Sequence, residues 1–531
     1  MRPRPAWLAS ACVSALLACS QRPLPWHDVP VQDAGVDLGV DLGLDVGQPL
    51  DAGGAQPGVL DWGIPVGTQP SVAVAGSTTV KAVVVTDDGG AVVAGSFTGM
   101  VAFAPDAVRD GTPGSGFVAR YRRDQRLVWV QVLRADPIDS NDGHVVVSDL
   151  AALGDGEVAV AGWFDGRLAV QRDVPPDDAT SAGGLDAFVA RLAADGSVRW
   201  TKRAGGPGDD IVRGVAAGSD ANGATSIALT GAIADGAVFG RGEAAETRAQ
   251  PSTGPIFAAR LNGDGLLAWA RFAGGGVPGQ GYGVAHDGAG AVAVTGYVNG
   301  VASFGKDASG AAVAIDPAIG RAFVARWDVA GSLAWALPIG GPAGEGDAIA
   351  IGAGGAIVAA GLFQGQARFG AGPSAPTLTA DAPGRDGCFL AAFSTAGATV
   401  WARRLVGIGL RAWRLRASSD GDLLVAASFG GGIVLDPDGA APLRVFSSGS
   451  TEALFARLGS DGTLRWATAG GGPGDEQGAD FTGTRDGASW AVGTYHGPAV
   501  FGEGSAFGAG MSVTLESGTD GGSFLLRLLA P

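Results

Sequence analysis

The segment AFVARWDVAGSLAWALPIGG, residues 322–341, predicts a β-hairpin. Phe323 and Arg326 lie in a first strand-forming run, Gly331 ends a turn, and Trp335 is the centre of a second run. Short runs rich in valine, phenylalanine and tryptophan, bounded by Gly, Asp and Asn, are typical of strands joined by tight turns. The chain repeats this hairpin along most of its length, so the repeat decides the fold.

Three sequence markers keep the same spacing through seven copies of the repeat. A tryptophan recurs every 65 to 71 residues, at Trp62, Trp129, Trp200, Trp269, Trp335, Trp401 and Trp466. An apolar residue precedes all but the first tryptophan by 12 positions, at Phe117, Phe188, Phe257, Phe323, Phe389 and Leu454. A small residue occupies an equivalent place in each copy, at Gly95, Gly162, Gly231, Gly296, Gly361, Ala427 and Gly493.

The first and last copies of the repeat complement each other. Trp62 has no FVAR-type strand before it, and Phe524 has no tryptophan strand after it. An open stack of repeats would leave two exposed sheet edges, which invite aggregation. In a ring, the strand around Trp62 completes the last sheet, and propellers of about 4 to 8 blades are known. We therefore expect an all-β fold: a seven-bladed β-propeller of four-stranded blades, with the last blade closed by the N-terminal strand.

The repeat resembles the bacterial SBBP-type β-propeller repeat in three motifs. These are GVAHD at 283–287, AVTG at 293–296 and DAFVARL at 186–192. The resemblance covers residues 58–531 and implies a propeller, without implying a ligand or an activity. This chain differs in using tryptophan where that repeat often has tyrosine, and in having Ala392 in place of the strand arginine.

Residues 1–19 read as an export signal that ends in a lipid-attachment site. Arg2 and Arg4 precede an apolar run, residues 6–18, that is too short to cross a bilayer as a helix. The sequence LLAC at 16–19 resembles a bacterial lipobox, in which lipid is attached to the cysteine, here Cys19. Ordinary signal cleavage, with Cys19 incidental, is the alternative. We expect an exported protein whose lipid anchor is its only membrane contact, at the outer membrane or cell surface.

Residues 20–57 predict a disordered Asp/Gly-rich linker. Alternation of like charges with glycine leaves no apolar face to bury. The calcium-binding alternative lacks the GGxGxD arrangement of RTX-type sites. The aspartates recur every four residues, at Asp33, Asp37, Asp41 and Asp45.

Composition excludes some classes of partner for the domain at 58–531. The net charge of −16 and pI of about 4.6 of the full chain argue against nucleic acid, because phosphate binding needs a basic face. No stretch after residue 18 is long and apolar enough to span a membrane. Cys388 is the only cysteine in this domain, so we expect no internal disulfide and interpret it as a small buried filler.

The sequence contains no catalytic or cofactor motif. G-x-S-x-G, H-E-x-x-H, P-loop and dinucleotide signatures are all absent. The histidines fall in the linker or at unrelated repeat positions, so we assign no metal, cofactor or catalytic residue. Paired carboxylates remain open, because a ring brings distant residues together. The histidines are His27, His144, His286 and His496.

The candidate binding residues are acidic and lie between outer and inner strands. The inserts between second and third strands, expected on the same face, are 104–115, 171–186, 240–255, 305–321, 370–387, 436–452 and 502–522. Variable loops on one rim of a rigid scaffold often carry binding. These acidic residues either cap turns or bind a cation or a sugar. They are Asp142, Asp209, Asp210, Glu345, Asp347, Asp475 and Glu476.

Two groups of arginines need separate interpretations. Arg411, Arg414 and Arg416, with Trp413, break the repeat pattern. We expect these arginines to pair with acidic neighbours rather than to form an anion pocket. An arginine that recurs in the third strand predicts a structural ion pair or a stem packed between blades. It occurs at Arg120, Arg191, Arg260, Arg326, Arg457 and Arg527.

These observations predict a surface-anchored bacterial lipoprotein with a monomeric, non-enzymatic propeller. The propeller would bind an unknown protein or carbohydrate, or have a structural role, without a cofactor. The alternative is a polysaccharide lyase or hydrolase with carboxylates at the mouth of the central channel.

Overall fold

The computed structural model describes most of the compact unit Gly53–Pro531. The predicted signal at 1–19, with Cys19, and the predicted linker at 20–57 lie outside the described residues. These residues are 59–67, 76–111, 114–138, 142–169, 180–220, 222–250, 252–370, 375–380, 386–407, 409–439, 442–447, 451–484, 487–502, 512–516 and 521–529.

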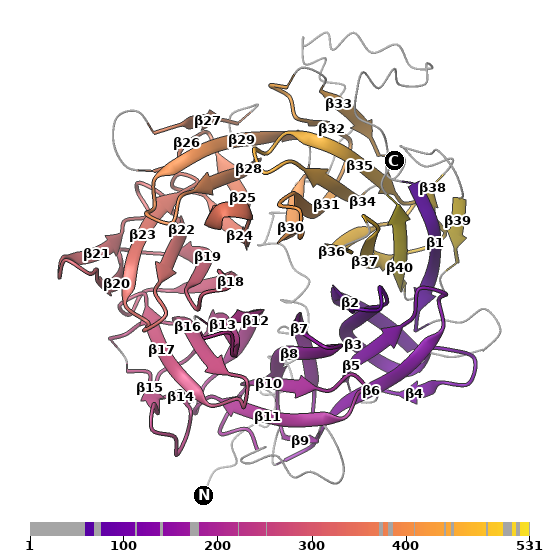
Figure 1. Ribbon diagram of the computed structural model, residues 1–531, viewed down its shortest axis with the longest axis horizontal. Helices are drawn as coiled ribbons and strands as arrows, with labels where there is room; N and C mark the ends of the chain where they lie inside the picture. The colour runs from indigo at the N-terminus through magenta and orange to yellow at the C-terminus, as the bar shows by residue number, and fades with distance from the viewer. Residues whose placement is uncertain are drawn as a thin grey trace, which may run out of the picture. The chain divides into compact units, whose positions relative to one another are not determined.

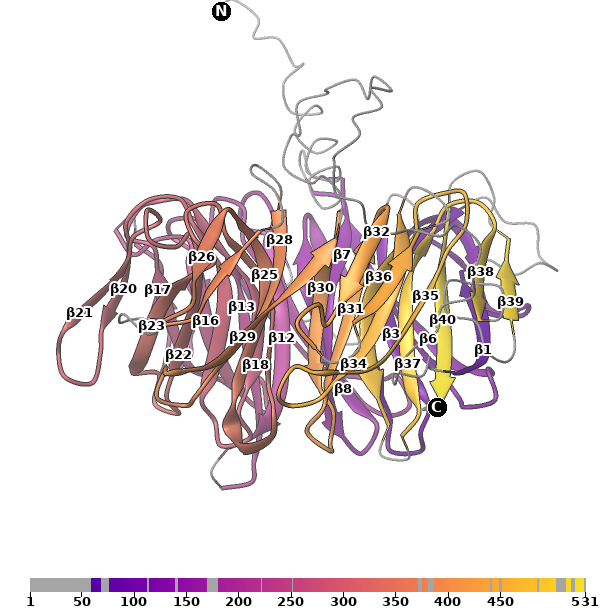
Figure 2. The same ribbon diagram turned by 90° about the horizontal axis from the view of Figure 1, so that it is seen from above.

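The described residues form seven four-stranded antiparallel blades around one axis (Figure 1), which confirms the predicted all-β propeller. In the side view, the strands run across the thickness of the ring (Figure 2). Blades 1 to 6 are β2-β3-β5-β6, β7-β8-β10-β11, β12-β13-β16-β17, β18-β19-β22-β23, β24-β25-β28-β29 and β30-β31-β34-β35. Blade 7 is β36-β37-β40-β1.

Each blade runs from an inner strand near the axis to an outer strand. The inner strands are β2 (Gly76–Val85), β7 (Val145–Gly154), β12 (Ile211–Ser219), β18 (Gly279–His286), β24 (Glu345–Ile351), β30 (Arg411–Ala417) and β36 (Gln477–Gly483). The second strands are β3 (Ala91–Ala102), β8 (Glu157–Phe164), β13 (Thr225–Ala232), β19 (Val292–Val298), β25 (Ile357–Gln364), β31 (Leu423–Phe429) and β37 (Ser489–Tyr495).

The hairpin that marks the repeat is the outer half of each blade. Its third strands are β5 (Ser115–Tyr121), β10 (Asp186–Leu192), β16 (Ile256–Asn262), β22 (Ala322–Trp327), β28 (Asp386–Phe393), β34 (Glu452–Leu458) and β40 (Gly522–Leu529). Its outer strands are β6 (Leu127–Asp136), β11 (Val198–Ala204), β17 (Leu267–Ala273), β23 (Leu333–Ile339), β29 (Thr399–Gly407), β35 (Leu464–Gly470) and β1 (Val59–Val66).

The N-terminal strand closes the ring as predicted. β1 pairs antiparallel with β40, placing Trp62 opposite Arg527 and Gly63 opposite Leu526. The indole of Trp62 also meets Trp490 of the same blade, with ring centroids 5.0 Å apart. Residues from the two ends of the chain therefore complete one sheet (Figure 1).

The described parts of the inserts between second and third strands lie away from the axis (Figure 1). These parts are short strands at the outer edge of the ring (Figure 1), and two of them, β9 and β32, extend the outer strand of the preceding blade. They are β4 (Val108–Asp110), β9 (Arg167–Ala169), β14 (Val238–Phe239), β15 (Thr247–Arg248), β20 (Ala302–Lys306), β21 (Ala312–Ile315), β26 (Gln366–Arg368), β27 (Thr377–Thr379), β32 (Gly432–Leu435), β33 (Leu443–Phe446), β38 (Ala499–Gly502) and β39 (Ser512–Leu515).

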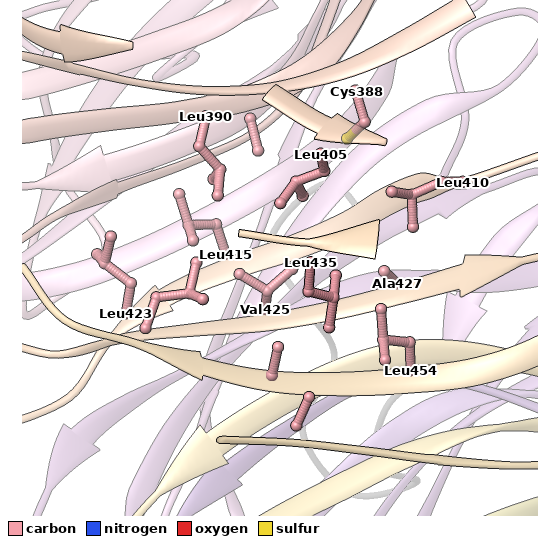
Figure 3. Packing of buried hydrophobic residues seen from close by; sticks show 14 of the residues in the cluster. Cys388, Leu390, Leu405, Leu410, Leu415, Leu423, Val425, Ala427, Leu435 and Leu454 are labelled. Atoms are coloured by element: carbon pink, nitrogen blue, oxygen red, sulfur yellow. The ribbon is translucent and has the colours of Figure 1, made fainter. Parts of the chain in front are cut away.

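The hydrophobic core is divided among the blade interfaces. Each cluster of buried side chains draws on two adjacent blades, and within the described residues there are seven such clusters. Figure 3 shows the one in which Leu390 of blade 5 packs with Leu415 and Val425 of blade 6. Cys388 lies in the same cluster, 2% exposed, which confirms the buried filler.

Within the described residues, a tryptophan joins six of the seven blades to the next one. Its indole N–H donates to a backbone carbonyl in the turn after the third strand of the following blade. The distances are 3.0 Å for Trp62 to Arg123, 2.9 Å for Trp129 to Ala194, 2.9 Å for Trp200 to Gly263, 3.1 Å for Trp269 to Val329, 2.9 Å for Trp335 to Thr395 and 3.2 Å for Trp401 to Ser460. For Trp466, the equivalent position is residue 530, outside the described residues.

Five of the receiving turns place a glycine beneath the tryptophan. Gly196 has φ of +85°, and a Cβ added there would lie 2.7 Å from the Trp129 ring. At five such turns the added atom would come within 2.7–3.0 Å of the indole, at Gly196, Gly265, Gly331, Gly397 and Gly462. Blade 1 differs, because Gln125 takes the positive φ of 73°.

Gly196→Ala is predicted to lower the stability of the ring more than Gly242→Ala. Both glycines have positive φ, but nothing lies within 4 Å of a Cβ at Gly242. The strained backbone costs each variant about 1–2 kcal/mol, and displacing the indole costs Gly196→Ala roughly 1–3 kcal/mol more. Thermal unfolding of the two variants measures the difference. Equal thermal midpoints for the two variants would contradict a stabilising contact between the Trp129 indole and the turn at Gly196.

Candidate functional site

The candidate site lies at the axis, on a β-bulge that each described inner strand carries at the same place. The pairing register shifts by one residue there, and a bulge bends the strand and re-aims its side chains. The residues left without a partner in the register are Lys81, Ser148, Arg213, Tyr282, Asp347, Trp413 and Ala479. The scaffold is repeated, but the residue it presents differs in each blade.

Ion pairs reach across the axis from blade 6 to blade 2. Arg414 on β30 lies 3.0 Å from an Asp149 carboxylate oxygen on β7, and Arg416 lies 3.4 Å from the other oxygen. Arg416 also forms two hydrogen bonds with Asp480 on β36, at 2.6 and 3.0 Å. We call Lys81, Asp149, Arg213, Arg414, Arg416 and Asp480 the axial cluster.

The axial carboxylates also hold the edges of neighbouring inner strands. Asp480 accepts the Val83 N–H at 3.0 Å, and Asp149 accepts the Val215 N–H at 3.0 Å. Burial disfavours the ionised form of Asp480, but Arg416 and Arg414 outweigh it and keep the Asp480 pKa below its usual value. Asp480 is therefore held ionised, and both side chains tie blades together through these backbone hydrogen bonds.

A second group lies where β24 and β30 begin. Arg411 contacts Asp347 at 3.0 Å and Glu345 at 3.8 Å. Burial raises the pKa of Asp347 to about 7, and the negative charge of nearby Glu345 adds to this rise. Arg411 opposes the rise, but it is shared between the two carboxyl groups. Glu345 and Asp347 lie within strand β24 rather than in the predicted loop. The pairing of Arg411, Arg414 and Arg416 with acidic neighbours is confirmed.

The other rim residues fasten the loops in which they lie. Asp209 accepts the Leu185 N–H at 3.0 Å. Asp210 accepts N–H groups of Gly206 and Ala234 at 2.7 and 2.8 Å. These contacts are those of turn caps.

Of the three remaining predicted rim residues, Glu476 is buried, whereas Asp142 and Asp475 are exposed. Glu476 accepts the Gly472 N–H at 2.8 Å, and the Asp475 carbonyl lies 3.0 Å from His496 Nδ1. Within the described ranges, no group of three or more His, Cys, Asp or Glu residues is placed to hold a metal ion.

The recurrent strand arginines form ion pairs inside their own blades, which confirms the structural interpretation for five of them. Arg260 instead lies 3.4 Å from Ser226 Oγ. The N–O distances of the pairs are 2.9 Å for Arg120–Asp88, 2.6 Å for Arg191–Glu157, 3.0 Å for Arg326–Asp287 and 2.8 Å for Arg457–Asp422, and Arg527 pairs with Asp61.

Sequence reasoning missed Lys81, Asp149, Arg213 and Asp480 as members of the site. A signal was present, because an alignment of the repeats places Lys81, Arg213 and Asp347 in one column. The residues that follow in those inner strands are glycine, alanine, valine and isoleucine, except for the serine at the end of β12. A polar residue in that column of an otherwise apolar strand indicates an axial position.

Comparison with known proteins yields likenesses of fold only. No family model matches the chain, and no curated protein matches it. A catalytically inactive virginiamycin B lyase from Staphylococcus aureus, solved with quinupristin, is 10% identical, with 88% of this chain and 99% of that chain covered and a TM-score of 0.37. Sqt1 from Chaetomium thermophilum is 11% identical over 84% and 100%, with a TM-score of 0.35. The polysaccharide lyase Uly1 is 8% identical over 85% and 89%, with a TM-score of 0.35.

Two buried carboxyl groups are predicted to make the ring less stable as the pH rises. Burial raises the pKa of Asp210 and of Glu476 to about 7, and nearby carboxylates add to the effect. An acid with a raised folded pKa stabilises the fold fully below its unfolded pKa, about 4. That contribution is lost as the pH rises through about 7.

The test compares thermal midpoints of the wild type and the double variant Asp210→Asn/Glu476→Gln between pH 5 and 8. The wild-type midpoint should fall relative to that of the variant as the pH rises. The difference between proteins removes the effect of other titrating groups. Parallel curves would contradict the raised pKa values.

Proposed function

We propose that the chain is an exported, lipid-anchored protein whose ring is a non-catalytic binding module for a protein or carbohydrate. The ligand would bind at the axis. The column of seven bulge residues carries this proposal, because a rigid repeated scaffold presents different side chains at one geometric position. Sites held by regular strands are more precise than sites held by loops.

The backbone hydrogen bonds of the rim carboxyl groups support binding rather than acid–base catalysis, whereas the pKa values of about 7 of Asp210, Asp347 and Glu476 are the feature that the enzyme alternative would use. Asp209, Asp210 and Glu476 accept backbone N–H groups and so hold loops in place. Asp480 is held ionised between arginines, and a general acid needs a pKa near the working pH. The alternative, a polysaccharide lyase or hydrolase, would need these same groups for proton transfer.

The export signal and lipobox support the anchor, although they lie outside the described residues. A single acyl chain binds a membrane weakly, so stable attachment needs the several chains that bacterial lipoproteins carry. Among the described residues, no helix has the length and apolar character required to cross a bilayer.

Replacing Cys19 is predicted to release the protein from the membrane. After detergent phase separation, the wild type should enter the detergent-rich phase and Cys19→Ser the aqueous phase. Cys12→Ser is the matched control, because Cys12 lies in the same segment but outside the lipobox. Cys19→Ser protein that still enters the detergent phase would rule out lipid attachment at Cys19.

Binding without turnover is the predicted outcome of screening the mature protein against polysaccharides and surface proteins. Tyr282→Ala should weaken binding, because Tyr282 occupies a bulge position. Asp264→Ala, an exposed turn substitution, should leave binding unchanged. Release of new reducing ends or unsaturated uronates, abolished in folded Asp209→Ala or Asp475→Ala, would establish the enzyme instead.

A further inference from the structure

We infer that Lys81, Arg213 and Arg414 form a binding site for an oxyanion, such as a carboxylate, phosphate or sulfate group, at the axis of the ring. The inference rests on the proposed function, because it gives the chemistry of the ligand that the axial site takes. The site combines cations from three separate blades.

The placement of the three cations follows from the strand order. Lys81 and Arg213 occupy the bulges of β2 and β12, the inner strands on either side of β7. Arg414 comes from β30, but its ion pair with Asp149 at 3.0 Å places its guanidinium against β7. The charges of Arg213 and Arg414 both act on Lys81, so the three positive side chains lie near one another at the axis.

Lys81 is the member of this group that lacks a partner. Among the described residues, no hydrogen bond or ion pair is made by Lys81 Nζ, although an ammonium has three N–H groups to donate. Arg414 and Arg416 are instead matched by Asp149 and Asp480. An oxyanion would supply the acceptor that the Lys81 ammonium lacks.

The electrostatics of Lys81 agree with this geometry. Burial, then repulsion from Arg213 and Arg414, lowers the pKa of Lys81 to about 8. The Lys81 amine is thus still mostly protonated at pH 7, but burial and the two neighbouring arginines disfavour its positive charge. A bound anion would offset the repulsion and so raise this pKa, because binding of charge and of proton are linked.

The carboxylates around Lys81 do not supply the acceptor that its ammonium lacks. Asp149 on β7 and Asp480 on β36 are already engaged by arginines and backbone N–H groups. The net charge of −16 is spread over the chain, and at physiological ionic strength its field is screened beyond about 8 Å. The nearby cations therefore decide which ion is attracted.

The chain has only three lysines, Lys81, Lys202 and Lys306, so each can be followed separately. The mature protein is labelled by reductive ¹³C-methylation, and the lysine signals are titrated by NMR with and without inorganic phosphate at constant ionic strength. The Lys81 signal should titrate near pH 8 and shift upward by roughly one unit when phosphate is ten times its dissociation constant. An unchanged Lys81 pKa with phosphate, sulfate and glucuronate would overturn the inference.

Variants locate the effect at the axis. Lys81→Gln and Arg213→Gln should weaken binding of the preferred anion at least tenfold by calorimetry. Lys306→Gln should bind like the wild type, because Lys306 is exposed on β20. Phosphate, sulfate and glucuronate are compared to identify the ligand class. Anion binding that survives Lys81→Gln would contradict the site.

This outcome is separable from that of the proposed function. A ring that binds a glycan or protein through Tyr282, while Lys81 ignores all three anions, retains the function and loses the oxyanion site. If the Lys81 pKa responds to an anion in a protein that also turns over polysaccharide, the oxyanion site is retained and the proposed non-catalytic function is lost.

Discussion

The hydrogen bond from an outer-strand tryptophan to the next blade, made by six of the seven tryptophans within the described residues, is the interaction on which the ring depends. One hairpin both receives an indole N–H, at the turn after its third strand, and supplies a tryptophan to the following blade. Trp129, for example, donates to Ala194 and covers Gly196. The donor and the receiving turn lie within one repeat unit, which explains why the apolar anchor, the turn and the tryptophan keep constant spacing. The series can be completed only if Trp62 comes from the other end of the chain.

Because the outer hairpins hold the ring together, the amino-acid sequence of the inner strands can differ from blade to blade. Their bulges place different residues at one position. In β30, Arg414 and Arg416 follow the bulge and form ion pairs with Asp149 across the axis. Asp149 and Asp480 link blades through backbone N–H groups. The axis is therefore both a structural junction and the place where the repeat is most varied, and that combination makes it the candidate site.

The architecture could be predicted from the sequence because local spacing encodes it. Seven tryptophans gave the number of blades, and the unmatched hairpin halves gave the closure by β1. The axial site could not be predicted in the same way, because Arg414 and Asp149 are 265 residues apart and meet only once the ring has closed. The bulges shift the register by one residue, which a simple alternation of strand faces does not reveal. The pairing of β9 and β32 with the preceding blade could not be predicted, because nothing in the sequences of these inserts indicates it.

The closure of the ring is tested most directly by a disulfide between β1 and β40. Gly63 and Leu526 are opposite each other in the register, and partners in antiparallel strands lie about 4.5–5.5 Å apart. In Gly63→Cys/Leu526→Cys, an intramolecular disulfide should form, seen by mass spectrometry after mild oxidation. Gly63→Cys/Leu525→Cys should not cross-link, because Leu525 points to the opposite face. Failure of the first pair to cross-link, or equal cross-linking of both, would contradict the closed ring.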